Sequence, residues 1–250
     1  MIRVSASAFD ILYSDLGYRD PPAPLRVRSV GATEADRRDI RAAVYENLAE
    51  RGLFHAGELD AALRERLRVL ARSSVYVECE ALLDLEQEEP LRAVAATTGR
   101  RGVLAVQPNR TIALAEIGGG SEVFAAAVGV LPPLSPGPGL GVSLPASVFG
   151  VDGEVDDPVY GDAESGRSAA QQRQLREVLA IQARPVLGAG QFSVRVREEA
   201  GSRRLGGVSW FSTDIGAYLG TTTEGRAGRQ WVNVAPADRE RIAARLAELP

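Results

Sequence analysis

The alternation of apolar and polar positions is clearest in the last sixty residues of the chain. Phe192, Val194 and Val196 alternate with polar side chains, which is the period of two expected of a strand with one buried face. Further strand patterns follow at 205–213, 217–223 and 230–235. Apolar residues at helical spacing come after Pro236, which suits the first turn of a helix. This segment therefore predicts four antiparallel strands closed by one amphipathic helix.

A similar pattern precedes this segment by about 118 positions. Val75, Val77 and Cys79 stand 117 positions before Phe192, Val194 and Val196. Strand patterns at 91–97, 103–107 and 111–117 complete a second meander, and the helical pattern after it lies 118 positions before its counterpart. An offset kept through strands and helix favours two similar halves, although two ordinary meanders placed by chance would also give it. We therefore predict an α+β fold with two quasi-symmetric halves, each an antiparallel β-meander with covering helices.

Helical patterns before and between the meanders supply the covering layer. Apolar residues at helical spacing predict helices over 5–17, 33–52, 58–71 and 168–181. Thr33 and Asp36 resemble a capping box at the start of the second of these helices. A short strand is expected at 25–30, after a proline-rich link. These helices need a sheet to cover.

A run dense in Pro and Gly, residues 132–139, is the best boundary between the halves. We expect an N-terminal α/β half over 1–131, a connector with an acidic loop over 132–165, and a C-terminal α/β half over 166–250, or one compact domain formed by all three. Within the connector, 141–149 could be a strand or plain connecting chain, and the six acids of 152–164 indicate a loop.

Composition narrows the classes of function. The chain of 250 residues has a net charge of −4 and a pI near 5.3, so it has no basic field and a nucleic-acid partner is disfavoured. All 29 basic residues are Arg, which excludes a Schiff-base lysine and the lysine of a P-loop. The single Cys79 excludes an internal disulfide and a multi-cysteine metal site.

The sequence contains no convincing motif for catalysis or for binding of a metal or phosphate. The only histidine, His55, has neither a nucleophile elbow nor metal-ligand spacing around it. The acids of 152–157 do not match a calcium loop, and Gly118–Ser121 lacks the phosphate-binding spacing. We therefore expect no catalytic residue, cofactor or metal. The absence of a signal peptide pattern and of a long apolar run predicts a cytoplasmic protein that does not insert into membranes.

Several segments together resemble the EspG family of ESX secretion-associated proteins of actinobacteria. They are Ala8–Gly17 (AFDILYSDLG), Gly31–Thr33 (GAT), Arg51–Leu53 (RGL), Gly207–Asp214 (GVSWFSTD) and Trp231–Pro236 (WVNVAP). The likeness runs over nearly the whole length and in the same order. It rests on the cumulative pattern, since no single motif is as specific as a metal-binding signature.

The resemblance implies a cytosolic chaperone of type VII secretion. Such a protein binds PE–PPE heterodimers, contacts the exposed apolar tip of the PPE partner, and keeps the pair soluble until export. In this family the loop between the first two strands of the first meander contributes to the partner surface. In this chain that loop spans 83–90, and the expected partner-binding residues are Asp84, Leu85, Glu86, Gln87, Glu88 and Glu89. Leu85 would offer an apolar contact within a charged rim, whereas a solvated hairpin is the alternative for this loop.

Other functions stay open at this stage. A non-catalytic interaction or dimerisation module unrelated to secretion is the first alternative, and a small-molecule enzyme is a weaker one. An enzyme would show a deep pocket with converging polar groups, whereas a chaperone would show a broad and partly apolar surface. We expect a monomer or a weak homodimer.

Overall fold

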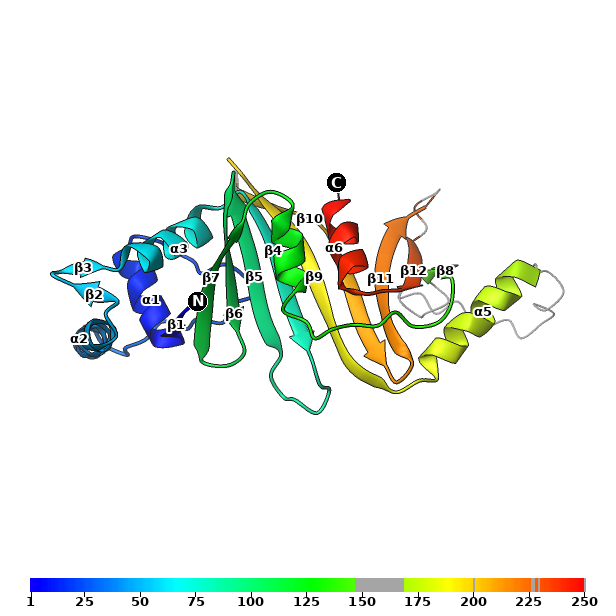
Figure 1. Cartoon of the computed structure of the whole chain (residues 1–250), viewed down its shortest axis with the longest axis horizontal. Helices are drawn as coiled ribbons and strands as arrows, with labels where there is room; N and C mark the ends of the chain where they lie inside the picture. The colour runs from blue at the N-terminus through cyan, green and yellow to red at the C-terminus, as the bar shows by residue number, and fades with distance from the viewer. Residues whose placement is uncertain (147–168, 200, 226–227, 229, 250) are drawn as a thin grey trace.

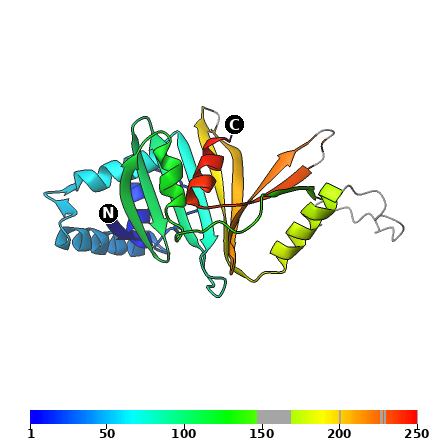
Figure 2. The ribbon, with the colours of Figure 1, turned by 45° about the vertical axis from the view of Figure 1, so that its right-hand side comes forward.

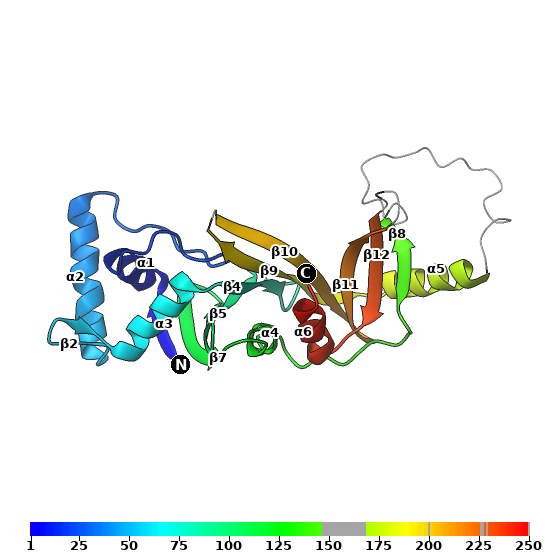
Figure 3. The ribbon, with the colours of Figure 1, turned by 90° about the horizontal axis from the view of Figure 1, so that it is seen from above.

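The fold is α+β, as predicted, and is built on one large antiparallel sheet (Figure 1). The computed structural model describes residues 1–146, 169–199, 201–225, 228 and 230–249. Ten strands form the main sheet in the order β1-β7-β6-β5-β4-β9-β10-β11-β12-β8. The sheet runs the length of an elongated molecule, with helices on both of its faces (Figures 1 and 3).

The N-terminal meander forms one half of the sheet. Its strands are β4 (Val75–Leu82), β5 (Leu91–Thr98), β6 (Arg101–Gln107) and β7 (Thr111–Gly118), and the edge strand β1 (Ile2–Ser5) pairs with β7. β5 is buried almost throughout because helices cover both of its faces. The sequence pattern predicts the four meander strands, as observed, but it does not predict β1.

The C-terminal meander forms the other half. Its strands are β9 (Val186–Glu198), β10 (Gly201–Thr213), β11 (Gly216–Glu224) and β12 (Gln230–Pro236), and the edge strand β8 (Val142–Pro145) pairs with β12. Residues 142–145 of the ambiguous segment 141–149 are thus a strand. The predicted acidic loop 152–164 lies outside the described residues.

The two meanders join through their first strands. β4 and β9 pair antiparallel over eight residue pairs, from Val75–Val196 to Leu82–Ala189. Each meander therefore lies on the open edge of the other. The element order is the same in both, but β9, β10 and β11 are longer than β4, β5 and β6, and the helices of the halves differ. The quasi-symmetry of the halves and the domain boundaries therefore stay predictions.

One face of the sheet is covered at its centre by two helices that contact each other, α4 (Glu122–Val128) and α6 (Arg239–Ala247) (Figure 1). The core beneath them draws on both meanders, with Val77, Phe192 and Trp210 buried together with Ile242 of α6. Asp238, whose carboxylate accepts a hydrogen bond from the Arg241 amide at 2.8 Å, caps α6. The prediction that Pro236 opens this helix is wrong, because Pro236 ends β12.

On the opposite face, the helices that the structure describes lie over the two ends of the sheet. Over the N-terminal meander lie α1 (Ala6–Asp15), α2 (Glu34–Glu50) and α3 (Ala61–Arg72), with a two-stranded hairpin of β2 (Phe54–His55) and β3 (Glu58–Leu59) beside them. The predicted capping box of Thr33 and Asp36 is present on α2. At the far end, α5 (Ala169–Gln182) contacts β8. Figure 2 shows this helix at the end of the molecule remote from α1–α3.

The strand predicted at 25–30 is absent. The backbone of Arg26 is instead held by the side chain of Gln107, which accepts from the Arg26 amide at 2.7 Å and donates to its carbonyl at 2.9 Å. A side-chain amide thus takes the place of a neighbouring strand, so the segment is extended without joining a sheet. This N-terminal strap, residues 18–33, crosses the face opposite α4 and α6 (Figure 3).

Candidate partner-binding surface

The loop between β4 and β5 protrudes from one end of these strands (Figure 1). All six residues predicted to bind a partner, Asp84, Leu85, Glu86, Gln87, Glu88 and Glu89, are exposed. The Asp84 carboxylate accepts from the amide of Glu86 at 2.9 Å, and the Asp84 carbonyl accepts from the amide of Gln87 at 3.1 Å. These two bonds give the loop a turn of its own, with its carboxylates directed to solvent.

The apolar residue of the loop has apolar neighbours from β9. The amide of Leu85 donates to the carbonyl of Leu187 at 3.2 Å, which continues the β4–β9 pairing into the loop. Leu85, Val186 and Leu187 are 45%, 40% and 52% exposed, although large aliphatic side chains are usually buried. We name these three residues the apolar lip. It places a hydrophobic contact directly beside the acidic rim.

An open trough crosses the middle of this sheet face, where none of the described helices covers it. Its floor is made of small or polar residues of β9, β10 and β11 that alternation turns away from α4 and α6, namely Gln191, Ser193, Gly207, Ser209 and Thr222. Three hollows of about 300, 350 and 260 Å³ share lining residues and follow one another along the floor. Pro24 of the N-terminal strap bounds the first, and α5 bounds the last.

The hollow beside α5 is the apolar part of the trough. Val178 and Ile181 of α5 face Phe211, Val232 and Val234 of the sheet across it. Phe211 stacks on Tyr218 with ring centroids 5.4 Å apart. Burial raises the pKa of the Tyr218 hydroxyl, which donates to the carbonyl of Pro138 at 3.2 Å. Of the two adjacent aromatics, Trp210 is core beneath α6, whereas Phe211 is half-buried on the trough side.

The carboxylates of Glu78 and Glu80, on the N-terminal side of the floor, are already paired. Glu78 accepts from Arg195 at 3.0 Å and from the Ser193 hydroxyl at 2.7 Å. Glu80 accepts at 3.1 Å from Arg92, whose side chain is only 7% exposed. Both carboxylates are thus engaged by arginines, which suits a contact surface better than proton transfer.

Residues with possible chemistry do not converge. Among the described residues, no group of three or more His, Cys, Asp or Glu could hold a metal ion. Cys79 is buried, and its burial raises the pKa of the thiol to about 12, while His55 lies in the small hairpin far along the chain from the trough. No helix within the described parts of the chain is long and apolar enough to cross a membrane.

The structure brings together parts of this surface that the sequence did not connect. Val186, Leu187 and the trough floor were missed as surface residues, because only the long-range β4–β9 pairing sets them beside the 83–90 loop. The alternation of Gln191, Ser193 and Arg195 was a usable signal for a polar sheet face. Nothing local in the sequence indicates that this face stays uncovered.

Comparisons with known proteins agree with this architecture. The sequence model described as "EspG family" matches residues 5–248. A comparison with curated protein sequences gives no match. Among solved structures, the chain is similar to the type VII secretion system chaperone EspG5 of Mycobacterium tuberculosis, solved in complex with the PE25–PPE41 dimer.

That structural likeness has a TM-score of 0.72 at 14% sequence identity and covers 99% of this chain and 95% of the other. At this identity it demonstrates a shared fold. The family match covers nearly every residue, including both meanders and the 83–90 loop. On these grounds the chain belongs to the EspG family.

Proposed function

We propose that this protein is a cytosolic secretion chaperone that binds PE–PPE heterodimers and keeps them soluble for export by a type VII (ESX) system. The observation that carries the proposal is the match to the EspG family over residues 5–248. The fold supports it, because a protein with the same architecture, EspG5, was solved in complex with the PE25–PPE41 dimer. The protein is not an enzyme in this proposal.

The physical task of such a chaperone is to cover an apolar surface that would otherwise drive its client to associate. The open trough and the apolar lip each offer exposed surface, and the lip offers an aliphatic contact. Burial of apolar area contributes about 25 cal/mol per Å², so a few well-packed aliphatic contacts are enough to compete with self-association of the client. Reversible binding also requires that the surface be only partly apolar.

Within this surface, Asp84, Leu85, Glu86, Gln87, Glu88 and Glu89 are the proposed partner-binding residues. Leu85 would make the apolar contact. The surrounding carboxylates would orient the PE–PPE client and disfavour proteins of unsuitable charge. The chaperone would work in the cytoplasm, as a monomer or weak homodimer.

Copurification tests the proposal. The tagged full-length protein is coexpressed with PE–PPE pairs encoded in the same genome, and the complex is isolated by size exclusion. We expect one or more pairs to be retained in a stable complex and to stay soluble only when the chaperone is present. Retention of no pair would overturn the proposal. A stable homodimer that binds no pair would favour the alternative, a dimerisation module unrelated to secretion.

A further inference from the structure

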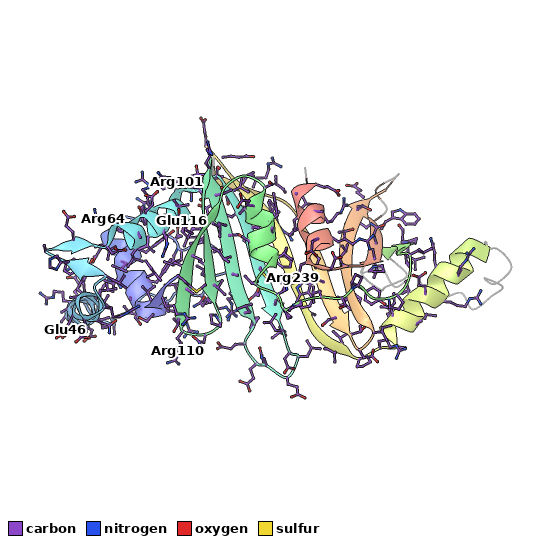
Figure 4. The ribbon with its side chains drawn as sticks, in the orientation of Figure 1. Glu46, Arg64, Arg101, Arg110, Glu116 and Arg239 are labelled. Atoms are coloured by element: carbon purple, nitrogen blue, oxygen red, sulfur yellow. The ribbon has the colours of Figure 1, made fainter. Side chains whose placement is uncertain are left out.

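The strands of the N-terminal meander end in groups of opposite charge. At one end, the β4–β5 loop carries the four exposed acids described above. Successive hairpins of a meander turn at alternate ends, so the β5–β6 turn lies at the other end, about 26 Å away along the eight residues of β5. Arginines from α3 and from the β5–β6 hairpin gather there. Figure 4 labels one of them, Arg101, at the top of the view, and Arg110 of the β6–β7 turn at the bottom.

Two of these arginines share a single carboxylate. Arg68 of α3 donates two hydrogen bonds of 2.7 Å to Glu65, and Arg101 at the start of β6 donates to the same carboxylate at 2.8 Å. Both arginine side chains stay accessible, at 44% and 67% exposed. The hydrogen bonds from Arg68, and then those from Arg101, lower the pKa of the Glu65 carboxyl to about 2. This carboxylate is therefore ionised, yet it neutralises only one of the two cations.

Two further arginines add charge without a carboxylate of their own. Arg72 lies one turn after Arg68 on α3, and its guanidinium stands over the Tyr18 ring at 5.8 Å from the centroid. Arg100 lies in the β5–β6 turn and is exposed. Neither arginine has an ion pair with any residue that the structure describes. Both guanidiniums are thus free to receive an anion from outside the chain.

We name this group the arginine end, made of Arg68, Arg72, Arg100, Arg101 and Glu65. Four positive charges against one negative charge leave a surplus of three, on a chain whose net charge is −4. Figure 4 labels Glu116, an exposed acid of β7, below Arg101, and counting this acid still leaves a surplus of two. The molecule is therefore electrically asymmetric along these strands, with its acidic loop at one end and the arginine end at the other.

The arginine end offers a partner charge rather than a groove. None of its residues lines the hollows described above. Guanidiniums suit phosphate groups, to which they donate paired hydrogen bonds. A bilayer with anionic phospholipids presents many phosphates in one plane, so it can satisfy several exposed guanidiniums at once. An acidic protein segment carries negative charge too, but protein interfaces gain most of their affinity from large side chains seated in pockets.

We propose that the arginine end docks this protein on the surface of a membrane rich in anionic phospholipids. This inference goes beyond the chaperone function proposed above and does not require it. Docking at this end leaves the β4–β5 loop, at the other end of the same strands, directed away from the membrane. Each net positive charge near such a surface strengthens binding about fivefold, so a surplus of two or three predicts a preference of about 30- to 150-fold over a neutral membrane.

The experiment measures sedimentation of the full-length protein with lipid vesicles. Vesicles of phosphatidylcholine alone are compared with vesicles of an equal mixture of phosphatidylcholine and phosphatidylglycerol. We expect binding to the mixed vesicles and not to the neutral ones, with an affinity that falls as salt rises. Arg100→Gln combined with Arg101→Gln removes two charges and should weaken binding at least about tenfold. Arg100→Glu combined with Arg101→Glu should abolish it.

A matched control separates the arginine end from the net charge of the protein. Arg38 of α2 and Arg110 of the β6–β7 turn are exposed and have no ion pair with a described residue. Arg38→Glu combined with Arg110→Glu carries the same change of net charge, and we expect it to bind the mixed vesicles as the wild type does. Circular dichroism of each variant confirms that it is folded.

Equal binding to both kinds of vesicle, or variants of the arginine end that bind like the control, would overturn the inference. Binding to polyglutamate that is lost in the same variants, without binding to vesicles, would assign the arginine end to an acidic protein partner and also overturn it. Because these measurements use the protein without a client, either outcome leaves the chaperone function untouched, and copurification tests that function separately.

Discussion

At the scale of residues, the burial of each charged group decides how much its pairing contributes to stability. Arg92 is nearly buried and has Glu80 as its carboxylate, whereas Arg203 and Glu198 are 60% and 49% exposed. Water solvates the second pair when it breaks, but it reaches the guanidinium of Arg92 poorly. Two ion pairs of similar geometry therefore differ in what their loss costs.

We expect Glu80→Ala to lower the free energy of unfolding by about 1–3 kcal/mol, because it leaves the Arg92 guanidinium buried with only a carbonyl as partner. Glu198→Ala should lower it by less than about 1 kcal/mol. Urea titrations followed by circular dichroism give both values. Equal losses in the two variants would show that water reaches Arg92 more freely than its exposure indicates.

A second residue-scale prediction concerns Cys79. Burial raises the pKa of its thiol to about 12 from an ordinary value of 9.0, so the folded protein holds it neutral and shielded. Stability linked to this group is fully present below pH 9.0 and falls as the pH rises toward about 12, because the unfolded thiol ionises first.

Alkylation of Cys79 by iodoacetamide at pH 8 should therefore be slower by orders of magnitude in the folded protein than in urea, with the urea midpoint decreasing between pH 9 and 11. Cys79→Ala provides the control, since its midpoint should decrease less over the same range. Fast alkylation without denaturant would place the thiol on an accessible surface and contradict the packing of β4.

At the scale of elements, the Pro- and Gly-rich segment after α4, residues 132–139, packs against the sheet. Ser135 and Gly137 pair with Ala217 of β11 through hydrogen bonds of 2.8 and 3.0 Å. Gly137 sits so close to the Tyr218 ring that a Cβ there would overlap it. The segment that the sequence marked as a boundary therefore holds β11 in place.

We expect Gly137→Ala to cost about 1–3 kcal/mol of unfolding free energy, because the ring of Tyr218 has no free space to move into. Tyr218→Phe removes only the hydroxyl bond to Pro138 and should cost about 0.5–1.5 kcal/mol. Chemical denaturation distinguishes the two. If Gly137→Ala matched the wild type, the connector would have to be loosely packed against β11.

These elements also show which parts of the structure could be predicted from the sequence. The strands of the two meanders were predictable, most of them because one-sided burial imposes a period of two. β5, which is buried on both faces, has a short run of mostly apolar residues instead. The capping box of α2 was predictable for a local reason as well. The short strands β1 and β8 and the Gln107 contact with the strap depend on partners distant in the sequence. Local patterns therefore missed β1 and the Gln107 contact, and they left β8 undecided between a strand and connecting chain. For the candidate partner-binding surface, Leu85 and the acidic residues around it could be proposed from the sequence, but Leu187 could not.

At the scale of the whole molecule, the two meanders share one sheet and one core. The residues beneath α4 and α6 come from β4 and β5 as well as from β9 and β10. Neither meander has a separate core on that face. The structure thus favours a single cooperative unit over two halves that unfold independently.

We expect the slowest-exchanging amides of β5 and β10 to report the same free energy of opening in native-state hydrogen exchange. The reason is that both strands contribute to the core shared beneath α4 and α6. Opening free energies that differ between the meanders by more than about 2 kcal/mol would instead support separate domains.

Because β4 and β9 pair but are distant in the sequence, the ribosome synthesises them at different times. β4 ends at Leu82 and its partner β9 begins at Val186, so 103 residues lie between the two strands. At about 5–20 residues per second, the ribosome takes about 5–20 s to deliver the second strand after the first. For that interval the nascent N-terminal meander has an open hydrogen-bonding edge. A protein proposed to guard the exposed surfaces of others thus passes through a stage in which its own sheet edge lacks a partner.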